Sequence, residues 1–155
     1  MRSLIYISFL LAIGLLSSCG PNVVYEEIHK LNESWSYDDT IDFGFTIDNP
    51  NQEYDLLLTV VHSSDFSYQN FYTQITTTYP TAEEFTSPLS IELANKMGSW
   101  LSSCSGEKCT LHLLLRDDVK FKDVGAYMIS FEQDTRDEKL KGIQSLGLSL
   151  IETEQ

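Results

Sequence analysis

Three cysteines are the residues of this 155-residue chain whose spacing suggests chemistry most directly. Cys104 and Cys109 enclose the residues Ser-Gly-Glu-Lys, which have the composition of a tight turn between two strands. A disulfide fits this spacing if the turn brings the two Cα atoms within about 7 Å. A zinc half-site would need a second pair of Cys or His ligands, and redox dithiols are usually spaced C-x-x-C. We therefore predict a Cys104–Cys109 disulfide, formed in an oxidising compartment.

The other reactive side chains form no motif of a known catalytic or metal site. His29, His62 and His112 lie far apart in the sequence, without the H-x-x-x-H spacing of a metal-binding helix. Acidic pairs such as Asp117-Asp118 lie in predicted turns, where solvated charges are common, and no spacing shows that two carboxylates face one cleft. The sequence also lacks G-x-S-x-G, a glycine-rich phosphate loop and an EF-hand loop. We predict that the protein is not an enzyme and has no metal or cofactor.

The third cysteine, Cys19, ends a segment typical of exported proteins. Arg2 precedes an apolar run over residues 4–16, and small residues follow, as in a secretory signal peptide. The sequence Leu16-Ser17-Ser18-Cys19 resembles the bacterial lipobox, in which the cysteine is lipidated and becomes the first mature residue. An ordinary signal peptide that happens to contain a cysteine is the alternative. We predict lipidation at Cys19, with several acyl chains that hold the protein firmly at the membrane.

The chain then divides into three parts. We predict a signal peptide over residues 1–18, a lipid-anchored tether over 19–24 and a single β domain over 25–155. The formal net charge of −13 argues against nucleic acid as a partner, because affinity for nucleic acid depends on Lys and Arg side chains that neutralise phosphates. Some surface-exported lipoproteins carry an acidic run directly after the lipobox cysteine, and this chain has no such run. We therefore expect an outer-membrane protein that faces the periplasm.

The elements that position these residues are predicted to be strands. Alternation of apolar and polar residues indicates strands with one buried face, while the run at 54–62 is apolar on both faces, as in a central strand. Strands are predicted at 25–31, 41–47, 54–62, 71–79, 89–93, 111–115, 127–131 and 146–150, and a loop at 80–88. Connections this short cannot hold crossover helices. The fold class is therefore all-β, an antiparallel β-sandwich of about eight strands, of which the jelly roll is one form.

The stretch 125–151 is predicted to organise the domain as strand, connection and strand. Its connection, Asp134–Lys141, is rich in charge and long enough for about two helical turns, with Asp134 as the N-cap. A polar connection between two well-patterned strands is a place where a small β domain presents a feature to solvent. We expect this feature to be structural or to contact a partner.

Two segments, together with the lipobox, carry a resemblance to a known family. They are Ser67-Tyr68-Gln69-Asn70-Phe71-Tyr72 and the closing Phe131-Glu132-Gln133-Asp134-Thr135-Arg136 with Leu140-Lys141-Gly142-Ile143-Gln144-Ser145-Leu146-Gly147-Leu148. Over essentially the whole mature chain the sequence resembles GldH, the gliding motility lipoprotein family of the Bacteroidota. The chain has Thr135 where the family usually has methionine, and the predicted disulfide is not taken from the resemblance.

The resemblance implies a non-catalytic envelope lipoprotein that is required for gliding and linked to the type IX secretion apparatus, with protein partners in that machinery. Gln133, Arg136 and Lys139 are our candidate partner contacts, because two cations lie together there in an otherwise acidic protein. The alternative is that Arg136 pairs with a neighbouring carboxylate or caps a strand end.

A second function also fits the sequence, that of a carbohydrate-binding envelope lipoprotein in a polysaccharide-utilisation system. Aromatic rings can stack on sugar rings, although in a sandwich of this size they more often fill the core or an edge. The candidates are Trp35, Tyr37, Tyr68, Phe71, Tyr72 and Trp100.

Overall fold

The structure, a computed structural model, describes residues 20–32 and 34–153, which form eleven β-strands and no helix. The strands are β1 (Asn22–Lys30), β2 (Ser34–Ser36), β3 (Ile41–Ile47), β4 (Glu53–Ser63), β5 (Asn70–Thr78), β6 (Glu84–Glu92), β7 (Ser103–Ser105), β8 (Lys108–Lys120), β9 (Gly125–Gln133), β10 (Lys139–Lys141) and β11 (Ile143–Glu152). The predicted all-β sandwich is confirmed. The strand count exceeds eight because β2, β7 and β10 have three residues each, too few to show alternation.

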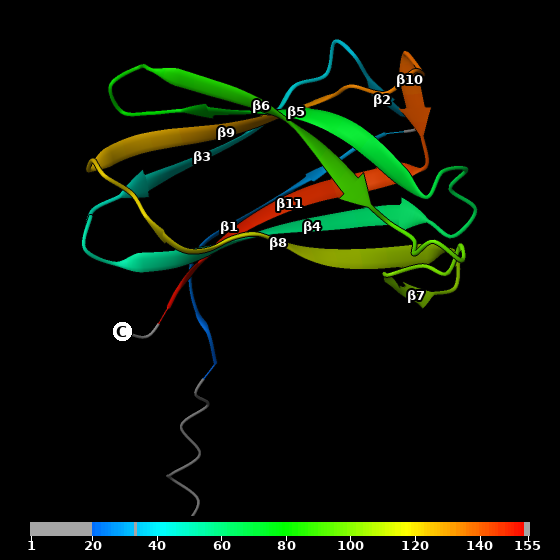
Figure 1. Ribbon diagram of the computed structural model, residues 1–155, viewed down its shortest axis with the longest axis horizontal. Coiled ribbons are helices and arrows are strands. Elements are labelled where there is room, and N and C mark those ends of the chain that lie inside the picture. Colours follow the sequence, from blue (N-terminus) through cyan, green and yellow to red (C-terminus); the bar gives the residue numbers. More distant parts are fainter. Residues whose placement is uncertain (1–19, 33, 154–155) are drawn as a thin grey trace, which may run out of the picture.

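Two antiparallel sheets form the layers of the sandwich (Figure 1). The lower sheet has the strand order β1-β11-β4-β8-β7, and the upper sheet has the order β3-β9-β5-β6. The short strands β2 and β10 pair at one end of the sandwich. Because β9 lies in the upper sheet and β11 in the lower, the stretch 125–151 crosses between layers and joins the two sheets.

The core lies between the sheets and is filled by the inward faces of alternating strands. β3 alternates buried and exposed residues along its whole length, as predicted. Its Phe43 meets Phe131 of β9 edge-to-face, with 5.9 Å between the ring centroids. From below, Leu146 and Leu148 of β11 are both fully buried. Burying each such side chain contributes on the order of 2 kcal/mol, so the predicted core pattern translates directly into stability.

The predicted helix over Asp134–Lys141 is wrong. Leu140 lies opposite Trp35 in the ladder of β10 and β2, and both side chains are fully buried. Burying these two side chains in one ladder outweighs the local helix preference of the charged residues around them. The connection is therefore a loop followed by a three-residue strand.

The predicted loop over residues 80–88 is also partly wrong, because β6 begins at Glu84. Proline lacks an N–H and cannot donate to a strand ladder, so it is rare inside a sheet. β6 is the last strand of its sheet, however, and pairs only with β5. Pro88 lies opposite Gln74, and an edge strand accepts proline because one of its sides needs no ladder hydrogen bonds.

At the N-terminus, β1 begins at Asn22, three residues before the predicted strand. The predicted signal peptide and Cys19 lie outside the described residues. Across residues 20–32 and 34–153, no helix is long and apolar enough to cross a membrane.

Candidate functional site

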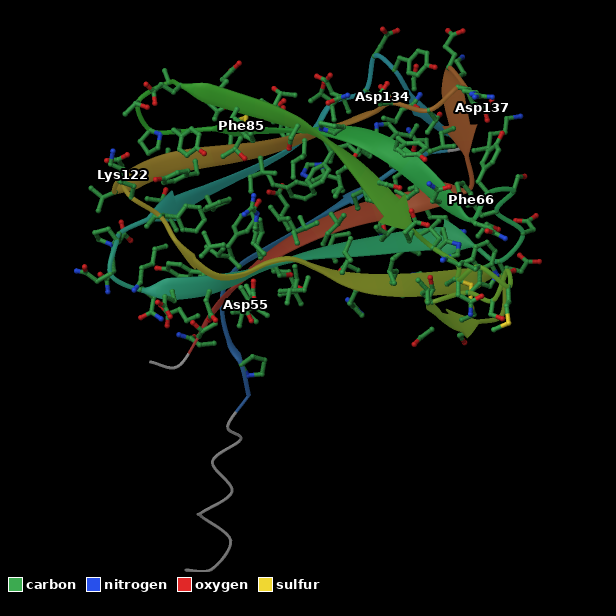
Figure 2. The ribbon with its side chains drawn as sticks, viewed as in Figure 1. Asp55, Phe66, Phe85, Lys122, Asp134 and Asp137 are labelled. Atoms are coloured by element: carbon green, nitrogen blue, oxygen red, sulfur yellow. A yellow bond between two sulfur atoms is a disulfide. The ribbon has the colours of Figure 1, made fainter. Side chains whose placement is uncertain are left out.

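A cleft of about 600 Å³ opens where β5 begins and β9 ends. Its walls bring together the two segments that carry the family resemblance. One wall comes from the approach to β5 and the other from the connection after β9, and the lining residues are Tyr68, Asn70, Phe71, Tyr72, Asp134, Thr135, Arg136 and Asp137. Figure 2 shows Asp134 and Asp137 on this side of the molecule, with Phe66 at the same end.

The pairing of β5 with β9 holds the two walls together. Thr73 lies opposite Gln133, and the ladder continues one step further because the Asp134 N–H donates to the Tyr72 carbonyl at 2.8 Å. The Gln74 amide also donates to Asp134 Oδ2 at 2.6 Å. Alternation along each strand was visible in the sequence, but this long-range pairing was not. The cleft is therefore a product of the sheet topology.

Gln133 shapes the loop that forms the second wall. Its side chain is only 4% exposed. The amide nitrogen donates to the carbonyls of Asp137 (2.9 Å) and Glu138 (3.2 Å), and the amide oxygen accepts from the N–H (3.1 Å) and hydroxyl (2.8 Å) of Thr135. Gln133 was predicted as a surface contact, and the structure instead gives it an internal role. Its burial left no signal in the sequence, because a polar residue is usually exposed.

Arg136 and Lys139, the other two predicted contacts, are exposed. Arg136 lines the cleft, whereas Lys139 lies in β10 opposite Ser36. Among residues 20–32 and 34–153, the Arg136 guanidinium has no hydrogen-bond or ion-pair partner. The alternative that Arg136 pairs with a neighbouring carboxylate is thus not what the structure shows. Its contact with a partner stays a prediction.

Two exposed tyrosines flank this arginine in the lining. Tyr68 is 47% exposed and Tyr72 is 52% exposed. The Tyr68 hydroxyl donates to Asp137 Oδ2 at 2.7 Å, and this hydrogen bond to a carboxylate raises the pKa of Tyr68. Behind the wall, the Phe66 ring lies 5.8 Å from the Tyr68 ring. The cleft therefore presents two exposed aromatic side chains, of which Tyr68 is held by a hydrogen bond, together with a free cation.

The lining is suited to binding. Among the described residues that line the cleft, Thr135 alone is a Ser, Thr or Cys, and its hydroxyl donates to the Gln133 amide oxygen. Tyrosine and arginine are the residue types most enriched at the energetic centres of protein interfaces.

The structure also shows a hydroxyl–imidazole pair that the sequence did not reveal. His62 is fully buried, and its Nδ1 lies 2.8 Å from the Ser63 carbonyl, which can only accept. Nδ1 therefore carries the proton, and Nε2 accepts from the Ser102 hydroxyl at 2.7 Å. Burial lowers the pKa of His62. This is the geometry of a nucleophile and its base, but Ser102 does not line the cleft between β5 and β9. We interpret the pair as a structural link.

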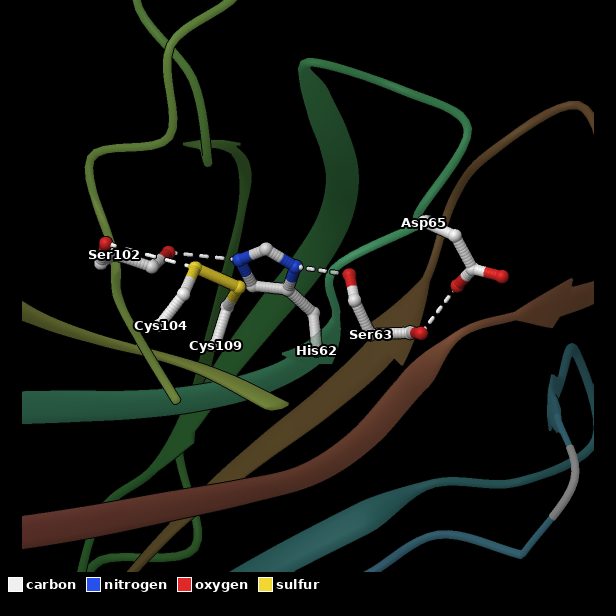
Figure 3. Close-up of a disulfide and its surroundings, with 6 residues drawn as sticks. All are labelled: His62, Ser63, Asp65, Ser102, Cys104 and Cys109. Atoms are coloured by element: carbon white, nitrogen blue, oxygen red, sulfur yellow. Dashed lines mark hydrogen bonds between the residues drawn. A yellow bond between two sulfur atoms is a disulfide. The ribbon is translucent and has the colours of Figure 1, made fainter. Parts of the chain in front are cut away.

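The predicted disulfide is confirmed and adjoins this pair (Figure 3). Cys104 and Cys109 lie opposite each other in the β7–β8 hairpin, with 4.0 Å between their Cα atoms. Gly106 takes a left-handed φ of 62° in the turn, which glycine adopts without strain. Cys109 also lies opposite His62 in the ladder with β4. The disulfide thus links the two strands of the hairpin, and the His62–Ser102 hydrogen bond links the residue before β7 to the central strand β4.

The three histidines are not brought together by the fold. His62 lies against the disulfide hairpin, His29 packs edge-on against Phe43, and His112 lies 3.0 Å from the Thr59 hydroxyl. Within the described part of the chain, no group of three or more His, Cys, Asp or Glu side chains could hold a metal ion.

Comparison with known proteins places the chain in a family. A family model described as GldH lipoprotein matches residues 23–150. The gliding motility lipoprotein GldH homolog of Christiangramia forsetii is 26% identical over 149 residues, which are 92% of this chain and 91% of that protein. The gliding motility lipoprotein GldH of Flavobacterium johnsoniae is 24% identical over 138 residues, 88% of this chain and 86% of that protein.

A superposition on a solved structure, CBM35 from Cellvibrio japonicus Abf62, includes 84% of this chain and 88% of that chain. Its sequence identity of 13% and TM-score of 0.31 are too low to support any conclusion. The family model, by contrast, spans most of the chain and both walls of the cleft. The resemblance inferred from the two cleft segments is therefore confirmed, and the chain belongs to the GldH lipoprotein family.

Proposed function

We propose that this gliding-related envelope lipoprotein is non-catalytic and binds a protein component of the gliding and type IX secretion machinery through the cleft between β5 and β9. One observation carries the proposal. The two segments from which the family resemblance was inferred meet in one cleft, where Tyr68, Tyr72 and an unpaired Arg136 are presented together. A carboxylate of the partner could accept two parallel hydrogen bonds from the Arg136 guanidinium, an arrangement that fits the planar geometry of both groups.

The proposed anchor keeps this domain close to the membrane. If Cys19 is lipidated, only Gly20 and Pro21 separate it from the first strand residue, Asn22. Three residue steps span at most about 11 Å even when fully extended. We place the protein on the periplasmic face of the outer membrane. A domain held this closely meets its partner in a restricted range of orientations.

Single-cell gliding tests the proposal. Arg136→Glu reverses the charge in the cleft, and Lys30→Glu, an exposed cation of β1 outside the cleft, is the matched control. We expect gliding to stop in the Arg136→Glu strain and to continue in the control, with equal amounts of both proteins in the membrane fraction. Normal gliding of the Arg136→Glu strain would contradict the role of the cleft.

The anchor is tested separately with Cys19→Ala. If gliding stops while the unanchored protein persists at normal levels, the domain acts at the membrane. If gliding continues even when the gene is deleted, the motility function itself is wrong.

Carbohydrate binding is the second candidate, because Tyr68 and Tyr72 expose aromatic faces beside Asn70 and Asp134 in the same cleft. Stacked rings and polar side chains together are able to hold a sugar. Calorimetric titration of the purified protein with envelope polysaccharides distinguishes the two functions. Binding that is lost in Tyr72→Ala supports the carbohydrate function.

A further inference from the structure

A second cavity, of about 460 Å³, reaches into the core at the far end of the sandwich. Leu56, Phe121, Tyr127 and Ile129 line it, and each of these side chains is less than 10% exposed. The Phe121 and Tyr127 rings pack edge-to-face, with 4.8 Å between their centroids. Ligand cavities in proteins commonly measure about 300–1,000 Å³ and are mostly apolar. This cavity has that size and an apolar interior.

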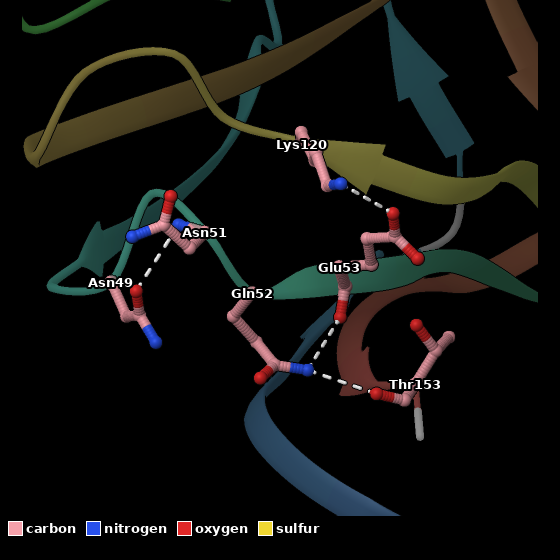
Figure 4. A network of polar contacts seen from close by, with 6 residues as sticks. All are labelled: Asn49, Asn51, Gln52, Glu53, Lys120 and Thr153. Carbon is pink, nitrogen blue, oxygen red and sulfur yellow. Dashed lines mark hydrogen bonds and ion pairs between the residues drawn. The ribbon is translucent and has the colours of Figure 1, made fainter. Parts of the chain in front are cut away.

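The mouth of the cavity is cationic, in contrast to the rest of the protein. Arg116, Lys120 and Lys122 line it, which is three of the ten Lys and Arg residues of a chain with a net charge of −13. In the part of the chain that the structure describes, no Asp or Glu lines the cavity. Lys120 forms an ion pair with Glu53 at 2.7 Å (Figure 4), while Arg116 and Lys122 have no ion-pair partner within the described residues. The mouth therefore favours an anion.

The opening results from irregularities in β8. Its pairing with β4 shifts register twice, on either side of the pair Leu56 and Arg116, and Asp118 takes a left-handed φ of 47°. Bulges of this kind bend a strand away from its neighbours. β7 pairs only with the first part of β8, at Lys108–Thr110, so the later part is an edge that no other strand covers. Arg116, Val119 and Lys120 of this irregular edge line the cavity.

The cavity lies near the point where the chain leaves the domain toward its proposed anchor. Asn22 is opposite Glu152, Glu152 is opposite Tyr54, and Tyr54 is opposite Val119, which lines the cavity. Three strand spacings amount to about 14 Å. Lys122 lies at the end of the molecule opposite Asp137 of the cleft (Figure 2). The cationic mouth is thus at the end of the sandwich nearest the lipid.

We propose that this cavity binds a single acyl chain with an anionic head group, taken from the adjacent membrane. The head group, a carboxylate or a phosphate, lies between Arg116 and Lys122, and the acyl chain packs against Phe121, Tyr127 and Ile129. An apolar interior alone would accept any hydrophobic molecule. The two unpaired cations select the anionic one.

Photocrosslinking tests the proposal on the full-length lipoprotein in nanodiscs of zwitterionic phosphatidylcholine. The probes are diazirine-bearing palmitic acid, the corresponding lysophosphatidic acid and the corresponding hexadecanol, and mass spectrometry maps the labelled peptides. We expect both anionic probes to label the peptides that contain Tyr79 and residues 119–127, and hexadecanol to label them at least about tenfold less. Competition by unlabelled palmitate or lysophosphatidate identifies which head group the cavity prefers.

Two charge variants complete the test. Arg116→Gln with Lys122→Gln should reduce labelling by the anionic probes about tenfold, because both groups that hold the head group are lost. Lys96→Gln with Lys108→Gln removes two exposed cations elsewhere and should leave labelling unchanged. Equal labelling by hexadecanol, labels spread over the whole surface, or equal labelling of the two double variants would each overturn the proposal. Gliding is not read in this experiment, so its outcome is independent of the function proposed for the cleft.

Discussion

Replacing Gln133 with leucine tests whether this buried amide organises the wall of the cleft. Leucine has a similar size and stays compatible with a β-strand, but it cannot form any of the four side-chain hydrogen bonds to Thr135, Asp137 and Glu138. Because the side chain is 4% exposed, water cannot replace it at its own position. The loop that carries Arg136 would lose its internal support.

The expected loss of stability follows from the surroundings of these bonds. A net contribution of about 1 kcal/mol for each bond gives an upper bound of about 4 kcal/mol. Asp137 and Glu138 are exposed, so water can reach their carbonyls once the loop moves, and the buried leucine recovers some transfer free energy. We therefore expect the free energy of unfolding to fall by about 2 kcal/mol.

Urea denaturation, followed by circular dichroism, measures this change. With an m value near 2 kcal/mol/M, a loss of about 2 kcal/mol lowers the midpoint by about 1 M without changing m. Gln74→Leu is the matched control, since Gln74 lies on the neighbouring strand and its amide makes one hydrogen bond, to Asp134, at the surface. The control should cost less than about 1 kcal/mol. If Gln133→Leu costs no more than Gln74→Leu, the organising role of Gln133 is refuted.

Three further predictions concern stability. His62 is buried, and its pKa lies below the ordinary value of 6.5, so the unfolded chain takes up the proton first as the pH drops. The free energy of unfolding should therefore fall below about pH 6.5. Urea titrations at pH 7.5 and 5.5 should show this fall in the natural protein and a smaller fall in His62→Gln. The Cys104–Cys109 disulfide closes a very short loop, so reducing it or changing both cysteines to alanine should lower the free energy of unfolding by about 2 kcal/mol at most. The shift of the urea midpoint measures this loss. A larger loss would show that the disulfide does more than close a loop. Gly142→Ala should cost about 2 kcal/mol, because φ is +91° there and the added Cβ would lie 2.9 Å from the Phe66 ring; an unchanged melting temperature would contradict this.

The fold was largely readable from the sequence because alternation directly reports which face of a strand is buried. Ile41–Ile47 alternates without exception, and β3 has those bounds and that buried face. The errors arose where a distant partner decides the structure. Leu140 became part of a strand through burial against Trp35, more than a hundred residues away in the sequence. Pro88 was accepted into a strand because β6 happens to be an edge.

The candidate functional residues were harder to predict for the same reason. The family resemblance of the two cleft segments was visible in the sequence, but their contact depends on the pairing of β5 with β9. Residue type also misled: Gln133 and Arg136 are both polar and close in sequence, yet one is buried and the other exposed. The cationic cavity gave no motif, because Arg116, Lys120 and Lys122 converge only through the bulges of β8.

The positions of the two sites relative to the anchor give the domain a polarity. β1 begins at Asn22, beside the proposed anchor, and its nine residues extend about 27 Å to Lys30, at the end where the β2–β10 ladder and the cleft lie. A two-sheet sandwich with a continuous core is stiff over that length. If Cys19 is lipidated as proposed, the domain would act as a spacer that holds the cleft away from the lipid, while the cavity would stay next to it. Because only Gly20 and Pro21 would separate a lipidated Cys19 from β1, an acyl chain bound in the cavity would add a second attachment and fix the tilt of the sandwich. A partner that binds the cleft would then find it at a defined height above the membrane and at a defined angle. A long, flexible tether would fix neither the height nor the angle.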